Sequence, residues 1–196
     1  CKDKIGDKWE GFANYWRTTQ LEYTWLRSLM KRHKDFWQVT EDSLDKSLLA
    51  FKIDPNMRSE LLNLYKILNT FPEVKDVLKN LKEKKYKISI LSNGTPDLLD
   101  ALVKSNDLEK MFDDIFSIEE VGIYKPDEKV YDMPIKKYKV EKNEVAFLSA
   151  NTWDVSAAGN FGLNAIWVNR NKNIFDKLDY IPHNEINNLN GLLKLI

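Results

Sequence analysis

The chain has 196 residues, of which 43% are hydrophobic and 31% charged, a composition typical of a soluble globular protein with one or two domains. Thirty basic and thirty acidic residues cancel, so no net field favours nucleic acid or an anionic membrane surface. A single cysteine, Cys1, excludes an internal disulfide and fits the cytoplasm, and no apolar run is long enough to span a membrane.

The first 69 residues are predicted to form a helical unit. From Lys8 to about Lys31, large apolar residues recur mostly at spacings of three, four and seven, which indicates a long amphipathic helix. We expect Thr40 to cap a second helix and Asp54-Pro55 to begin a third, because proline is favoured just after an N-cap. The third helix would carry Met57, Leu61, Leu64 and Leu68.

From residue 70 onward, helices and strands alternate. A helix with an apolar stripe precedes a strand at Lys87–Ser92, and Thr95-Pro96 begins the next helix. Further strands are predicted at about 114–118, 145–149 and 165–169. This alternation predicts an α/β core at 70–196 with a parallel sheet covered on both faces, beside a helical subdomain at 1–69.

Polar side chains gather where the predicted strands end, and ligands bind at this edge of open parallel sheets. Lys125 lies in a loop between two of the strands, where Pro126 disfavours helix at the lysine and Asp127 can begin the next helix. The polar and aromatic side chains that directly follow strands are Ser92, Asn93, Ser149, Asn151, Trp153 and Asp154.

Each of these residues also has a purely structural interpretation. Asp154 could cap the helix that follows it, and Lys125 could be a solvated surface lysine. Ser92 and Asn93 could simply form a turn, and Trp153 could be a core residue. Arg17 could be an ordinary arginine on a helix surface, with its charged end in solvent. A functional site is favoured because three separate segments deliver polar groups to one sheet edge.

Three segments together resemble a known family. ILSNGTP (90–96), YKPDEKVY (124–131) and FLSANTWD (147–154) resemble motifs two, three and four of the haloacid dehalogenase superfamily, and more narrowly the L-2-haloacid dehalogenases. The segment YWRTTQLEYTWLRSLM (15–30) is similar to the cap helix of that subfamily. The resemblance covers essentially the whole chain and implies a Rossmann-like parallel-sheet core with a helical cap.

The resemblance implies an enzyme that hydrolyses short (S)-2-haloacids to (R)-2-hydroxyacids without a metal or other cofactor. An aspartate attacks C2, expels halide with inversion and forms an ester that water then hydrolyses. Lys125 matches the lysine that keeps this aspartate ionised. Ser149, Asn151 and Asp154 match the group that positions the lysine and the hydrolytic water.

The resemblance also assigns a substrate pocket. Arg17, Asn93 and Trp153 match the residues around the departing halide. Ser92 matches the residue that binds the substrate carboxylate. Tyr131 and Phe36 match residues that form the wall of the active site. Superfamily phosphatases carry acidic residues in motif four to hold Mg²⁺, whereas here Asp154 is the single acid in that motif, which indicates metal independence.

The first motif of the family is a strand that ends in the nucleophilic aspartate, and residues 1–196 do not contain it. The chain opens at CKDKIGDKWEGF, already similar to the cap. We expect that the chain is truncated and lacks on the order of 20 residues, including the central strand between those ending at Ser92 and Ser149. A signal segment upstream of Cys1 is an open alternative.

Two other functions compete with the dehalogenase. One is a Mg²⁺-dependent phosphatase of the same fold, and the other is a truncated, non-catalytic binding relative. The expected partner is a small 2-haloacid, with no nucleic acid and no membrane. Aromatic residues such as Trp25 and Trp37 would suit a homodimer interface, and they suit a buried cap core equally well.

Overall fold

The computed structural model describes all of residues 1–196, and the chain forms two compact units. The first unit comprises Cys1–Asn69 and Asn93–Asp107, and the second comprises Thr70–Ser92 and Leu108–Ile196. The chain therefore passes between the units more than once. The sequence predicted a cap at 1–69 and a core at 70–196, and it placed Asn93–Asp107 in the core. In the structure this segment clusters with the first unit. The assignment of the two parts as cap and core stays a prediction.

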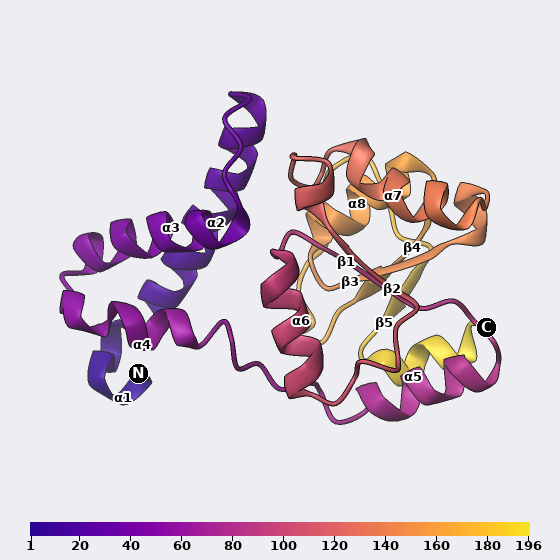
Figure 1. The fold of residues 1–196 in the computed structure, drawn as a ribbon, viewed down its shortest axis with the longest axis horizontal. Coiled ribbons are helices and arrows are strands. Elements are labelled where there is room, and N and C mark those ends of the chain that lie inside the picture. Colours follow the sequence, from indigo (N-terminus) through magenta and orange to yellow (C-terminus); the bar gives the residue numbers. More distant parts are fainter. The chain divides into compact units, whose positions relative to one another are not determined.

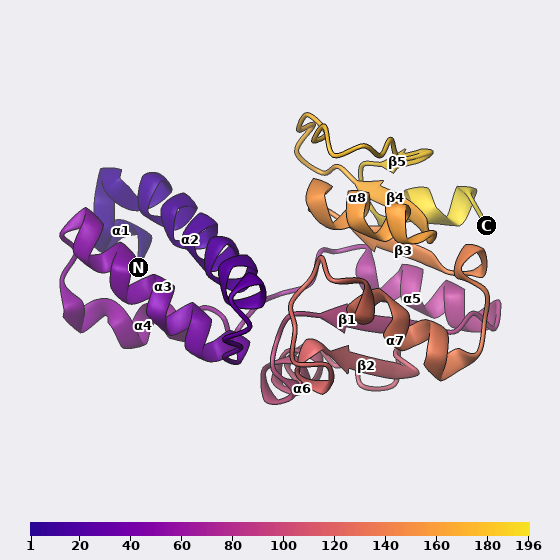
Figure 2. The ribbon, with the colours of Figure 1, turned by 90° about the horizontal axis from the view of Figure 1, so that it is seen from above.

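The first unit is helical, and α2 and α3 pack side by side within it (Figures 1 and 2). Its centre is an apolar cluster that includes Phe12, Trp16 and Leu44, all buried. The amphipathic helix predicted from Lys8 is therefore confirmed. The helices of this unit are α1 (Lys2–Ile5), α2 (Trp9–Leu29), α3 (Phe36–Phe51), α4 (Arg58–Asn63) and α6 (Pro96–Ser105), with short 3-10 turns at Gly6–Lys8 and Pro55–Met57.

The second predicted helix begins earlier than expected, so Thr40 as its cap is wrong. Asp35 is the N-cap of α3, and its side chain accepts a hydrogen bond from the Gln38 N–H at 2.8 Å. Thr40 is instead buried inside the helix, where its hydroxyl donates to the Phe36 carbonyl. A threonine in mid-helix can bond back to the preceding turn in this way, which removes its value as a boundary signal.

The third predicted helix is shorter than its apolar pattern. Asp54 is an N-cap as predicted, and its side chain accepts from the Asn56 N–H. The α-helix that follows ends at Asn63, so Leu64 is its C-cap and Leu68 lies beyond it. Both leucines are exposed, and the chain leaves the apolar cluster before the pattern ends.

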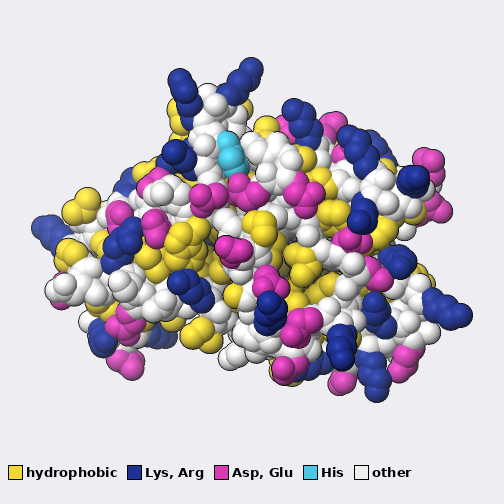
Figure 3. Space-filling model, in the orientation of Figure 1, with side chains coloured by type: hydrophobic (Ala, Val, Ile, Leu, Met, Phe, Trp, Pro, Cys, Tyr) yellow, Lys and Arg dark blue, Asp and Glu magenta, His cyan; other side chains and the backbone are white.

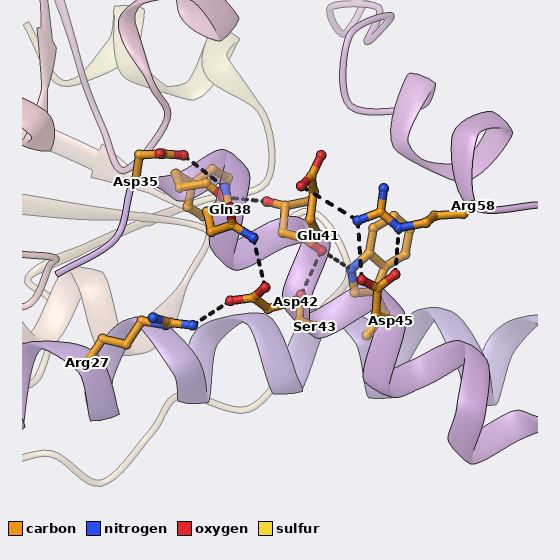
Figure 4. A network of polar contacts seen from close by, with 11 residues as sticks. Arg27, Asp35, Gln38, Glu41, Asp42, Ser43, Asp45 and Arg58 are labelled. Carbon is orange, nitrogen blue, oxygen red and sulfur yellow. Dashed lines mark hydrogen bonds and ion pairs between the residues drawn. The ribbon is translucent and has the colours of Figure 1, made fainter. Parts of the chain in front are cut away.

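Polar side chains tie α3 to its two neighbours (Figure 4). Arg27 of α2 forms an ion pair with Asp42 of α3 at 2.5 Å, and Gln38 donates to the same carboxylate. On the other side, the guanidinium of Arg58 in α4 makes two hydrogen bonds to Asp45. Bidentate geometry of this kind fixes the orientation of the arginine as well as its distance.

The second unit contains five parallel strands in two sheets, which confirms the predicted α/β class. One sheet has the order β1-β2 and the other β3-β4-β5. The strands are β1 (Ser89–Ser92), β2 (Asp114–Ser117), β3 (Ala146–Ser149), β4 (Asn164–Val168) and β5 (Asn184–Ile186). The helices are α5 (Val74–Glu83), α7 (Glu128–Tyr138) and α8 (Thr152–Phe161), with 3-10 turns at Ile118–Glu120, Lys142–Glu144 and Leu189–Lys194.

Both faces of β4 are buried, which explains its uninterrupted apolar sequence. Ile166 and Val168 face a cluster that contains Val77 and Leu81 of α5. Ala165 and Trp167 belong to a second cluster, formed largely by residues of α7 and α8. The three-stranded sheet is thus covered on both faces at β4.

Between the two sheets, β1 and β3 each have a partner on one side alone. β1 pairs with β2, and β3 pairs with β4 (Figure 2). Leu91 of β1 packs against the cluster that also receives Phe147 of β3. The sequence predicted these two strands as the neighbours of a further central strand, and none of the strands of residues 1–196 stands between them.

Charges of both signs are mixed over the face shown in Figure 3, in keeping with the zero formal net charge. None of the helices combines the length with the apolar character that crossing a membrane requires.

Candidate active site

Lys125 is buried, with 6% of its surface exposed, so the interpretation as a solvated lysine is wrong. The peptide bond between Lys125 and Pro126 is cis, and Asp127 caps α7 by accepting a hydrogen bond from the Lys129 N–H at 2.9 Å. Lys125 thus lies in a loop and Asp127 begins the next helix, as the sequence predicted.

Asp154 is the partner of Lys125. It lies in the first turn of α8, is 4% exposed, and its Oδ2 is 3.1 Å from Nζ of Lys125. Asn151, rather than Asp154, occupies the N-cap position of the helix. The carboxylate therefore serves a buried ion pair and not a helix cap.

Two hydroxyl groups complete the surroundings of this carboxylate. The Tyr131 hydroxyl donates to Asp154 Oδ1 at 2.7 Å, and the Ser149 hydroxyl donates to Oδ2 at 3.0 Å. Four parts of the second unit therefore meet at one carboxylate: the end of β3, the first turn of α7, the first turn of α8, and the loop before α7. Two of the three segments that the sequence predicted to converge, the Lys125 loop and the residues from Ser149 to Asp154, therefore meet here.

Burial and the charge of Asp154 oppose each other in their effect on the pKa of Lys125, but act together on the pKa of Tyr131. Burial lowers the pKa of Lys125, and the Asp154 carboxylate counteracts this by favouring the ammonium form. Burial also raises the pKa of Tyr131, and the negative charge of Asp154 raises it further. Lys125 and Asp154 face each other at 3.1 Å, a distance at which the carboxylate favours the ammonium form of the lysine.

The turn from β3 into α8 positions two further predicted residues. The Asn151 N–H donates to the Ser149 hydroxyl at 3.2 Å, which bends the chain at the end of the strand. Asn151 and Trp153 are half-buried and line an open recess of about 600 Å³. The other residues lining this recess are Ala150, Thr152, Lys172, Asn173 and Ile174.

Sequence reasoning missed the segment Lys172–Ile174, which approaches from the end of β4. β4 is the parallel neighbour of β3, so the carboxyl ends of both strands meet at one sheet edge. The rule that selected Ser149 and Asn151 could therefore have selected the residues that follow β4 as well. Ser92 ends β1 in the other sheet, in register with Ser117 of β2.

Three predicted site residues belong to the first unit. Arg17 is exposed on α2 and donates to the Gln20 side-chain oxygen at 2.9 Å. Phe36 is the first residue of α3 and is 8% exposed. Asn93 is half-buried and lies two residues before Thr95, the N-cap of α6. Their participation in the same site as Lys125 stays a prediction.

Comparison with known proteins identifies the family. A family model described as haloacid dehalogenase-like hydrolase matches residues 19–168. The (S)-2-haloacid dehalogenase of Pseudomonas sp. (strain YL) is 37% identical over 197 residues, which cover 100% of this chain and 85% of that protein. The chain belongs to the haloacid dehalogenase-like hydrolase family.

Solved structures agree with this membership of the haloacid dehalogenase-like family. The crystal structure of a dehalogenase has a TM-score of 0.95 and 34% sequence identity, and the match covers 99% of this chain and 87% of that chain. An L-2-haloacid dehalogenase from Xanthobacter autotrophicus, with chloropropionic acid covalently bound, has a TM-score of 0.89 and 29% identity over 96% of this chain and 86% of that chain. The family and fold class predicted from the sequence are confirmed.

Proposed function

We propose that this chain belongs to an enzyme that hydrolyses short (S)-2-haloacids to (R)-2-hydroxyacids through an aspartyl ester. The observation that carries the proposal is the buried pair of Lys125 and Asp154, held by the Tyr131 and Ser149 hydroxyls. The similarity to a protein named (S)-2-haloacid dehalogenase, over the full length of this chain, supports the substrate class.

In the first step, a carboxylate displaces the halide from C2. The nucleophilic aspartate is expected on a strand outside residues 1–196, and Lys125 keeps it ionised, because a cation a few ångströms away lowers the pKa of a carboxyl group by about 1–3 units. A halide leaves as a weakly basic anion and needs no proton. Arg17, Asn93 and Trp153 supply a cation, an amide donor and an indole edge for the developing charge.

In the second step, water cleaves the ester, and this step needs a base. Asp154 is the buried acid nearest to Lys125, and three donors fix the orientation of its carboxylate. General-base assistance of this kind contributes on the order of 10²–10⁴ in rate. Asn151, at the rim of the recess, helps to position the water.

The competing Mg²⁺-dependent phosphatase fits these residues less well. Mg²⁺ is usually held by carboxylates together with water and substrate phosphate. In the turn after β3, Asp154 is the single acid, and both of its oxygens already accept hydrogen bonds from protein groups. To bind a metal ion, Asp154 would first have to lose its contact with Lys125.

The test is an assay of the full-length protein with (S)-2-chloropropionate and with p-nitrophenyl phosphate, each with and without EDTA. We expect chloride release that is insensitive to EDTA, and a product of inverted configuration. Lys125→Met serves as the control for background hydrolysis. Phosphate release that requires Mg²⁺, without chloride release, would replace this proposal with the phosphatase.

A further inference from the structure

The recess beside Asn151 and Trp153 has a second wall that the proposed mechanism does not use. Lys172, Asn173 and Ile174 form this wall, and they follow β4, whereas Asn151 and Trp153 follow β3. All of these residues belong to the second unit. The recess therefore lies at the sheet edge where parallel strands present ligand-binding groups.

Lys172 brings an uncompensated positive charge to the recess. Its side chain is exposed, and its ammonium group has no hydrogen bond or ion pair within its own unit. Asp176, the acid nearest along the chain, already accepts a hydrogen bond from the Thr152 hydroxyl. The recess thus has a free cation on a wall whose nearest acid in sequence is engaged elsewhere.

The backbone that carries Lys172 is held in place, although its side chain is free. The Asn173 N–H donates to Oδ1 of Asn169 at 2.8 Å, and the Asn169 side-chain amide donates back to the Asn173 carbonyl at 3.1 Å. Asn169 is itself buried at the end of β4. These two hydrogen bonds close a turn that contains Lys172. They fix the backbone of Lys172 beside the recess, while its side chain stays mobile.

We propose that Lys172 draws the carboxylate of an anionic substrate into the recess beside Asn151 and Trp153. The substrate class rests on the proposed function, since a 2-haloacid is an anion at neutral pH. The chain has no net charge to attract such an anion from a distance, so a local cation has to act within the screening length of about 8–10 Å. A lysine suits this task because its ammonium is a mobile point charge.

In this proposal Lys172 attracts the substrate and takes no part in the reaction. Its loss should therefore affect KM more than kcat. In the full-length protein, Lys172→Gln should lower kcat/KM for (S)-2-chloropropionate about fivefold at low salt, mainly through KM, with kcat nearly unchanged. The difference should shrink at 0.5 M NaCl because screening removes the attraction. Lys172→Arg keeps the charge and should retain most of the wild-type kcat/KM.

Lys139 provides a matched control. It is exposed, its φ of 54° equals that of Lys172, and it lies at the C-terminus of α7 without lining the recess. Lys139→Gln removes the same charge from an exposed residue with the same φ. It should leave kcat/KM at the wild-type value at both salt concentrations.

Binding measured independently of turnover separates this inference from the proposed function. Titration with 2-chloropropionate, followed by the indole N–H resonance of Trp153 in ¹⁵N spectra, should give weaker binding to Lys172→Gln than to wild type and Lys139→Gln. If the wild type binds in this way but releases no chloride, the proposed function fails and the role of Lys172 stands. Equal affinities and equal kcat/KM values for wild type and Lys172→Gln overturn the inference, as does equal loss in Lys139→Gln or absence of binding to the wild type.

Discussion

At the scale of single residues, the central feature is a carboxylate that cannot be changed without affecting three donors. Asp154 is 4% exposed and accepts hydrogen bonds from Lys125, Tyr131 and Ser149. Removing one member of a buried pair leaves an uncompensated charge, which typically costs about 3–5 kcal/mol. Variants of this cluster therefore change stability as well as catalysis, and both have to be measured.

Asp154→Asn keeps the shape of the side chain and removes the proposed base. We expect chloride release in a burst of about one equivalent per active site, followed by turnover slowed on the order of 10²–10⁴, because ester hydrolysis is affected more than ester formation. Rapid-quench measurement of chloride, with mass spectrometry of the trapped ester, checks this.

The matched control is Asp176→Asn, which removes an exposed acid that bonds to Thr152 of the same helix. It should show neither the burst nor the slow phase. Full steady-state turnover by a folded Asp154→Asn protein would show that another group activates the water.

The sequence grouped Lys125, Ser149 and Asp154, whereas it gave Tyr131 only as a wall of the substrate pocket. Lys125, Ser149 and Asp154 could be found because each follows a strand or precedes a helix with a recognisable cap. The bond from Tyr131 to Asp154 could not be found, because it depends on how α7 packs beside α8. Local spacing contains no information about that packing.

At the scale of elements, helix α8 and the segment after β4 fit together at one small residue. Gly159 lies inside α8, and the ring of Tyr180 rests against it so closely that a Cβ at Gly159 would be 2.1 Å from Cζ of the ring. Phe175 packs edge-on against Trp167 at a centroid distance of 5.1 Å. The segment that carries Lys172 is thus held against α8 and β4 by two aromatic contacts.

Because of this contact, we expect Gly159→Ala to change the free energy of unfolding in opposite directions with and without the Tyr180 ring. In the wild type, Gly159→Ala should reduce the free energy of unfolding by about 1–3 kcal/mol, because the new methyl group displaces the Tyr180 ring. In a Tyr180→Ala background, the same substitution should stabilise by up to about 1 kcal/mol, because alanine is favoured over glycine inside a helix. Urea unfolding of the four proteins measures both effects, and equal effects in the two backgrounds would contradict the contact.

Element boundaries show where sequence patterns lose information. The strands at β1 to β4 were predicted to within about two residues. The apolar run of β4 reflects burial on both faces, whereas β1, β2 and β3 are only partly buried. β5 was missed because Asn184–Ile186 has a single buried apolar residue, Ile186, and no visible period. Thr40 was mistaken for a cap because the sequence does not distinguish a threonine that caps a helix from one inside a helix. The hydroxyl of Thr40 donates to the Phe36 carbonyl in the preceding turn.

At the scale of the whole molecule, stability should depend on pH through two tyrosines whose pKa values the fold raises, Tyr131 and Tyr138. Burial raises the pKa of Tyr138 to about 12 and that of Tyr131 further, whereas both titrate near 10 in an unfolded chain. A raised folded-state pKa gives stability that is complete below pH 10 and is lost as the pH rises towards 12. Lys125, with its lowered pKa, acts in the opposite direction, but its contribution stops changing above about pH 10.5.

We therefore expect the urea midpoint of the wild type to fall between pH 10 and 12. Tyr138→Phe and Tyr131→Phe should each have a smaller fall than the wild type, because each removes one group that ionises more readily in the unfolded state. Tyr86→Phe, at an exposed tyrosine, is the control and should follow the wild type. Parallel curves for all four proteins would mean that surface lysines alone cause the alkaline loss.

The hydrogen bonds around Asp154 also restrict the path of a proton. A carboxylate offers about four lone-pair positions, and here Lys125 and Ser149 occupy those of Oδ2 while Tyr131 takes one on Oδ1. One position on Oδ1 is left. If the proposed base is Asp154, a proton taken from water has this one position to occupy, and the fold thereby restricts where the hydrolytic water can lie.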